Sequence, residues 1–155
     1  VLTSSTPPGV LKNMSYEYTK RKIVCVVSDN LESWQTMNVV GHLAVGLGAN
    51  KDSELMGRSV LKDASHVDHL GIARYGFIIK KGNPATIREA IEASRQVENI
   101  IVLDFPKEML DTSHDDELSD WISQKEEKTF EYLGAIFYGP SDKITQLTKK
   151  FPLWS

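Results

Sequence analysis

Cysteine is almost absent from this chain of 155 residues, in which Cys25 is the only one. A single thiol cannot form a disulfide within the chain, and a protein without disulfides suits a reducing compartment. The sequence also lacks any stretch approaching the roughly 18 consecutive apolar residues of a membrane-spanning helix. We therefore expect a cytoplasmic protein without a membrane partner.

A basic excess is missing as well. The formal net charge is −3, whereas dedicated nucleic-acid-binding domains carry a cationic surface that neutralises phosphates. The composition therefore argues against a nucleic-acid partner. Residues Val1–Gly9 do not place a basic segment before an apolar one, so they do not form a secretory signal. We expect residues 1–20, rich in Thr, Ser and Pro, to form an extended N-terminal arm.

Two common functional signatures are absent too. No serine lies in the Gly-x-Ser-x-Gly turn of the α/β-hydrolases. Gly46-x-Gly48 lies at the end of a predicted helix, whereas a dinucleotide-binding fingerprint opens a helix after a strand. We therefore predict no cofactor.

The chain instead contains short apolar runs separated by turn and cap residues. The five apolar residues Ile23–Val27 predict a strand that is buried on both faces, and Cys25 in its middle is expected to be an inert buried thiol. Further strands are predicted over residues 58–62, 75–80, 99–105 and 130–138, with a hairpin or loop over 63–70.

Helix signals lie between these strands. A helix is predicted from Ser33 to the stop at Gly48, and another follows the cap Asn83 with Pro84 in its first turn. Shorter helices are predicted after Ser113 and after Ser141. The order β-α-β-β-α-β-α-β-α predicts one layered α/β domain over residues 21–155 with a largely parallel sheet.

The first candidate site follows the first strand. Asp29 lies at its carboxyl end, where ligands gather in open α/β sheets, and Trp34, Asn38 and His42 share one stripe of the next helix. Asp29, Trp34 and Asn38 could bind a ligand, and His42 could transfer protons near neutral pH. The alternative is that Asp29 forms a turn and the stripe is a solvated helix face.

The second candidate site is the segment from Asp63 to Gly71, which concentrates His66, Asp68 and His69. His66-x-Asp68-His69 is similar to part of a metallo-β-lactamase ligand motif, but Ala64 occupies the position of a further histidine. We therefore favour a polar loop over a metal site and predict no metal. Asp63 is a candidate ligand-binding residue and His69 a candidate catalytic one.

Several segments resemble a known family. Residues 22–31 are similar to the opening of peptidyl-tRNA hydrolase II domains, and more similar to that of their uncharacterised relatives, known as domain of unknown function 2000. Residues 38–48 resemble the first helix of those relatives and 63–72 their middle loop. Residues 133–140 and 147–153 resemble their ending. The resemblance covers roughly residues 20–154.

The resemblance implies a three-layer α/β/α sandwich with a mixed, largely parallel sheet of the peptidyl-tRNA hydrolase II type. In an ester-hydrolysing enzyme of this kind, Asp29 would orient, Asn38 would position the ester and His42 or His69 would transfer protons. The hydrolases open their first helix with a Gly-Lys-rich segment and an Ala-Ala-Gln stretch. Residues 32–38 contain neither, which argues against tRNA hydrolysis.

Two functions remain open from the sequence. The favoured one is a non-catalytic module that binds a small molecule or regulates a partner. The alternative is a hydrolase acting on peptidyl-tRNA or a related aminoacyl ester. A homodimer formed through an exposed helix or an edge strand is compatible with both.

Overall fold

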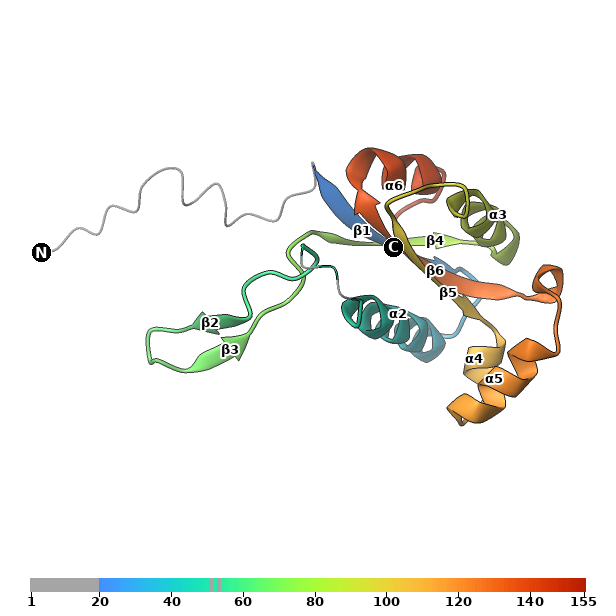
Figure 1. The fold of residues 1–155 in the computed structure, drawn as a ribbon, viewed down its shortest axis with the longest axis horizontal. Coiled ribbons are helices and arrows are strands. Elements are labelled where there is room, and N and C mark those ends of the chain that lie inside the picture. The colour runs from blue at the N-terminus through green and yellow to red at the C-terminus, as the bar shows by residue number, and fades with distance from the viewer. Residues whose placement is uncertain (1–19, 51, 53) are drawn as a thin grey trace, which may run out of the picture.

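The computed structural model describes residues 20–50, 52 and 54–155, so nearly all of the predicted N-terminal arm lies outside the described residues. Figure 1 shows strands and helices mixed along the described chain. The elements are β1 (Arg21–Ser28), α2 (Ser33–Gly48), β2 (Val60–Lys62), β3 (Asp68–Leu70), β4 (Phe77–Gly82), α3 (Pro84–Ser94), β5 (Ile101–Pro106), α4 (Glu108–Asp111), α5 (Asp115–Ser123), a 3₁₀ turn η1 (Glu127–Thr129), β6 (Tyr132–Pro140) and α6 (Ser141–Thr148).

The main sheet is mixed and has the strand order β4-β1-β6-β5. Strand β4 pairs with β1 in parallel, whereas β6 pairs antiparallel with both β1 and β5. Three strands therefore run in one direction, but only one of the three pairings is parallel. The prediction of a largely parallel sheet is corrected on this point, because the last strand inserts between β1 and β5 instead of adding to an edge.

Burial explains why β1 and β6 occupy the centre. Residues Ile23–Ser28 and Tyr132–Gly139 are all buried, as expected for strands that are covered on both faces. Alternate residues of β1 enter separate cores: Ile23, Cys25 and Val27 pack with α2, and Val24 and Val26 pack with α3 and α6. Helices therefore cover both faces of the sheet (Figure 1).

Local sequence sets the helix starts. The backbone N–H of Glu32 donates to Oε1 of Gln35 at 3.0 Å, so α2 is capped one residue before the predicted Ser33. Asn83 caps α3 as predicted, since its Oδ1 accepts from the N–H of Thr86 at 2.9 Å. Helix α4 lies between the strand predicted to end at residue 105 and the helix predicted after Ser113, where the sequence predicts no helix.

Strands β2 and β3 form a separate hairpin that projects from the body (Figure 1). We call residues 56–72 the hairpin arm. Its base continues the ladder, because the N–H of Gly57 donates to the carbonyl of Ile72 at 2.9 Å and that of Arg74 to the carbonyl of Leu55 at 2.8 Å. Leu55 and Tyr75 are buried in the core that α2 covers, so they anchor the arm at both ends.

Gly134 lets α2 approach the sheet. A Cβ added there would lie 2.8 Å from Cγ1 of Val39 and 3.1 Å from the carbonyl oxygen of Val26. Both contacts are too short for ordinary packing, and the carbonyl belongs to a buried central strand that cannot easily move. Glycine in β6 therefore sets the distance between α2 and the sheet.

Replacing Gly134 with Ala should lower the free energy of unfolding by about 1–3 kcal/mol, because the methyl group overpacks this layer. Gly41→Ala is the matched control in α2, where an added Cβ meets nothing within 4 Å. It should raise the free energy of unfolding by about 1 kcal/mol through helix propensity. Urea denaturation measures both. A stabilising Gly134→Ala would show that α2 is not held at contact distance.

Candidate functional site

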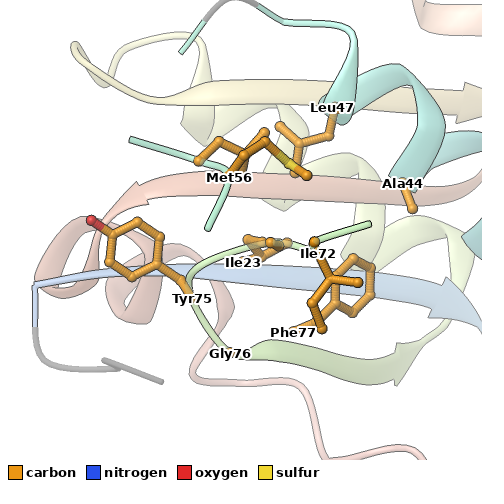
Figure 2. Close-up of a pocket in the computed structure, with 12 residues that line it drawn as sticks. Ile23, Ala44, Leu47, Met56, Ile72, Tyr75, Gly76 and Phe77 are labelled. Atoms are coloured by element: carbon orange, nitrogen blue, oxygen red, sulfur yellow. The ribbon is translucent and has the colours of Figure 1, made fainter. Parts of the chain in front are cut away.

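An apolar pocket of about 500 Å³ lies between the C-terminal half of α2, the base of the hairpin arm and the starts of β1 and β4. Figure 2 shows Met56 and Leu47 on one side of it, Ile72 and Phe77 on the other, and Ile23 between them. The lining residues are Ile23, Ala44, Leu47, Gly48, Leu55, Met56, Gly71, Ile72, Ala73, Tyr75, Gly76 and Phe77.

The pocket has a buried floor and an exposed apolar rim. Ile23 and Leu47 are buried in the core between β1 and α2, which gives the pocket a rigid floor. Met56 and Ile72 are 46% and 62% exposed, although both are large apolar side chains. The rim therefore keeps apolar surface in contact with water, which is typical of a binding site.

The chemistry of the lining is uniform. Among the described residues that line it, none carries a carboxylate, imidazole, amine or thiol, and Tyr75 alone carries a hydroxyl. In Figure 2 that hydroxyl points away from the labelled apolar side chains, so the ring of Tyr75 is what faces them. These described residues can hold an apolar group by burial and shape, but they offer it no acid, base or nucleophile.

The predicted stripe on α2 lies elsewhere on that helix. Trp34, Asn38 and His42 are all exposed, and of the three only His42 lines a described cavity. This second hollow, of about 330 Å³, is also lined by Ser113 and His114, which precede α5, and by Asp115, the first residue of α5. The His42 ring lies 6.2 Å from the Phe105 ring between centroids. We call this hollow the His42 cavity.

Asp104 lines the His42 cavity but directs its carboxylate elsewhere. Its neighbours Leu103 and Phe105 pack into the core on the α2 side, so alternation along β5 turns the Asp104 side chain to the opposite face. There it faces Arg95 and Glu127, both bonded to the hydroxyl of Tyr132. Burial raises the pKa of the Asp104 carboxyl, and the Arg95 charge only partly opposes it.

The second predicted site is part of the hairpin arm. Asp63 Oδ1 accepts from the N–H groups of Ser65 and Val67 at 2.8 and 3.0 Å, and Oδ2 lies 3.1 Å from Nε2 of His69. The His69 contact and these backbone hydrogen bonds lower the pKa of Asp63. Asp63 and His69 therefore hold the hairpin turn together.

The predicted site residues are thus distributed over three places. Asp29 is exposed after β1, the stripe lies on α2, and Asp63 and His69 lie on the arm. Cys25 is fully buried in β1, as predicted, and burial raises its pKa to about 12. In the part of the chain that the structure describes, no three His, Cys, Asp or Glu side chains are placed to share a metal ion.

Sequence reasoning missed the apolar pocket. Its lining comes from β1, α2, β4 and both ends of the arm, and none of those residues carries a group that signals chemistry. One signal was available, since Ala44 and Gly48 are small residues on α2, spaced one turn apart. Small side chains there leave space beside the helix.

Comparisons with known proteins agree with this fold. A family model described as "Protein of unknown function (DUF2000)" matches residues 21–155. The chain belongs to this family. The predicted resemblance to it is confirmed. Curated proteins yielded no match.

Similarity to a solved structure supports the fold alone. The protein of unknown function Atu0240 from Agrobacterium tumefaciens strain C58 is similar, with a TM-score of 0.78 and 20% sequence identity over 88% of this chain and 98% of that one. Among the described residues, no helix is long and apolar enough to cross a membrane.

Replacing Asp104 with Asn should raise the free energy of unfolding at pH 7. The native state favours the neutral acid because burial raises its pKa, so ionisation at neutral pH costs stability. The gain should shrink as the pH falls through the raised pKa of the native state, and it should vanish well below about 4, the ordinary pKa of Asp, where the carboxyl is neutral in both states. Urea denaturation at pH 7 and pH 3 measures the difference. An equal gain at both values would contradict this account.

Proposed function

We propose that this protein is a non-catalytic module that binds a small apolar ligand, in the pocket between α2 and the base of the hairpin arm. The observation that carries the proposal is the pocket itself, which combines a volume of about 500 Å³ with an almost wholly apolar lining. Ligand pockets in proteins range from roughly 300 to 1,000 Å³ and are mostly apolar.

The energetics favour a compact hydrocarbon or aromatic group. Burying apolar surface stabilises a complex by about 25 cal/mol per Å², less the cost of immobilising the ligand. The lining residues that the structure describes carry no charge that could offset the desolvation of a charged ligand group. The ligand should therefore place an apolar body in the pocket and keep any polar group at the exposed rim, near Met56 and Ile72.

The proposal includes a fold of the peptidyl-tRNA hydrolase II type. Helices on both faces of a mixed sheet are what a three-layer sandwich of the peptidyl-tRNA hydrolase II type requires. Such a likeness supports an architecture and not an activity, because one fold hosts many functions. A binding module that retains the architecture without the lysine-bearing segment of the hydrolases agrees with both observations.

Gly48→Leu tests the proposal by filling the pocket. Gly48 lines it, and an added Cβ meets nothing within 4 Å, so the leucine should enter empty space without strain. A neutral fluorescent probe, Nile red, should bind the native protein saturably at one site. The substitution should weaken that binding at least tenfold while leaving the protein folded.

Gly41→Leu is the matched control. It lies on the same helix with equally open space at its Cβ, but it does not line the pocket. It should leave the affinity for Nile red within about twofold of the native value. An equal loss in both variants, or no saturable binding by the native protein, would overturn the proposal.

A second candidate function is hydrolysis of peptidyl-tRNA or a related aminoacyl ester at the His42 cavity. The observation in its favour is that His42 shares that cavity with Ser113, His114 and Asp115, which gives an imidazole a polar setting open to solvent. An imidazole so placed can transfer protons near neutral pH. The apolar pocket would take part in this reaction only if one substrate occupied both the pocket and the His42 cavity.

If this candidate is right, His42→Gln should reduce ester cleavage by about 100-fold or more, the usual contribution of a general acid or base. His69→Gln is the control, because His69 lies on the arm with Asp63 and should leave the rate unchanged. Release of the peptide from peptidyl-tRNA measures both variants. Absence of cleavage by the native protein would exclude this candidate.

A further inference from the structure

The hairpin arm is exposed along its whole length. Every residue from Met56 to Leu70 is exposed, and β2 and β3 pair with each other and not with the main sheet. Beyond Met56 and Ile72 at its base, the arm nevertheless carries four large apolar side chains: Val60, Leu61, Val67 and Leu70, with exposed fractions of 43, 47, 54 and 83%. A two-stranded hairpin is marginally stable in water, and a third strand or a packed face is normally needed to hold it.

The charges on the arm do not oppose close approach of another protein surface. Lys62 and Asp68 form an ion pair across the hairpin, with Nζ 2.5 Å from Oδ1. The Asp63 carboxylate contacts the His69 ring, with Oδ2 3.1 Å from Nε2. The Lys62 charge on β2 is therefore matched by a carboxylate beside it, so two β2 edges can meet without strong repulsion.

The backbone register shows which groups are free to pair. The N–H of Asp63 donates to the carbonyl of Val67, and the N–H of Gly71 donates to the carbonyl of Ser59. Leu61, which lies two residues from both Ser59 and Asp63, therefore also directs its polar groups toward β3. By the alternation of an antiparallel ladder, Val60 and Lys62 direct theirs outward, along an edge that no strand of the described chain covers.

We propose that β2 pairs antiparallel with β2 of a second copy, about a two-fold axis at Leu61. Val60 of each copy then exchanges backbone hydrogen bonds with Lys62 of the other. The two Leu61 side chains face each other as a close pair without hydrogen bonds between their own backbones. The result is a four-stranded sheet, β3-β2-β2-β3, that extends each marginal hairpin by two strands.

The alternative edge, β3 with β3, fits less well. A two-fold axis at its middle residue, His69, would set Asp68 of each copy opposite Leu70 of the other, so that a short carboxylate side chain would face an apolar one. The edge of β2 instead brings together Val60, Leu61 and the aliphatic stem of Lys62. The self-complementary edge is therefore that of β2, and a two-fold interface requires such self-complementarity.

The dimer does not depend on the apolar pocket. The pocket lies at the base of the arm, lined by Met56 and Ile72, whereas the proposed contact lies at residues 60–62. Failure of Nile red binding would thus leave the dimer untouched. Failure of dimerisation would likewise leave the pocket proposal standing.

Cysteine cross-linking of the full chain tests the pairing directly. Facing residues without mutual hydrogen bonds lie with Cα atoms about 4.5 Å apart, which a disulfide can span. Leu61→Cys should give a disulfide-linked dimer under mild oxidation, whereas Leu70→Cys, the more exposed position on β3, should remain largely unlinked. The native Cys25 is fully buried and should not interfere.

Analytical ultracentrifugation of the unmodified chain is the second test of the pairing. The native protein should show a concentration-dependent dimer that Leu61→Lys weakens at least tenfold, because two ammonium groups would meet at the axis. Leu70→Lys should weaken it less than threefold. Equal cross-linking at positions 61 and 70, a greater effect of Leu70→Lys, or a monomer at every concentration would overturn the proposal.

Discussion

The fold depends on the burial of one central strand. Strand β6 is covered on both faces and paired on both edges, by β1 and β5, so its polar backbone groups are satisfied while its side chains build two cores. Its glycine at position 134 then determines how closely α2 can pack. The floor of the apolar pocket follows from this arrangement, because Leu47 of α2 and Ile23 of β1 meet only when that layer is closed.

The pocket and the arm share one structural cause. The chain leaves α2 at Gly48, runs out through the arm and returns to the sheet at Tyr75. The arm is held at both ends by buried apolar residues, Leu55 and Tyr75. The apolar pocket lies at its base, and exposed apolar side chains lie along its length. The proposed ligand site and the proposed contact between copies therefore both belong to the same insertion between α2 and β4.

Much of the secondary structure could be predicted because its signals are local. The run Ile23–Val27 predicted a doubly buried strand, and Asn83-Pro84 predicted a helix start. The direction and place of β6 could not be predicted in this way, since strand pairing is decided by which edges are free in three dimensions. Helix α4 was missed because four residues carry too little periodicity to be recognised.

The site was harder to predict than the fold. His42 was singled out for its chemistry and does line a cavity, yet Asp63 and His69 are occupied with each other in the arm. The apolar pocket has no reactive residue to mark it and is assembled from distant segments. A pocket that depends on shape and burial cannot be predicted from the types of its residues. Histidine and aspartate are singled out as candidate acids and bases even where, as in the arm, their side chains contact each other in a turn.

The most direct test of ligand binding is an NMR titration of the methyl-labelled protein with Nile red. We expect the methyl signals of Ile23, Leu47 and Ile72, which line the pocket, to shift together and to saturate at one equivalent of Nile red. Signals of Ile144 and Leu147, in the core on the other face of the sheet, should stay in place. Shifts scattered over both faces, or none at saturating probe, would contradict the claim that this pocket is the binding site.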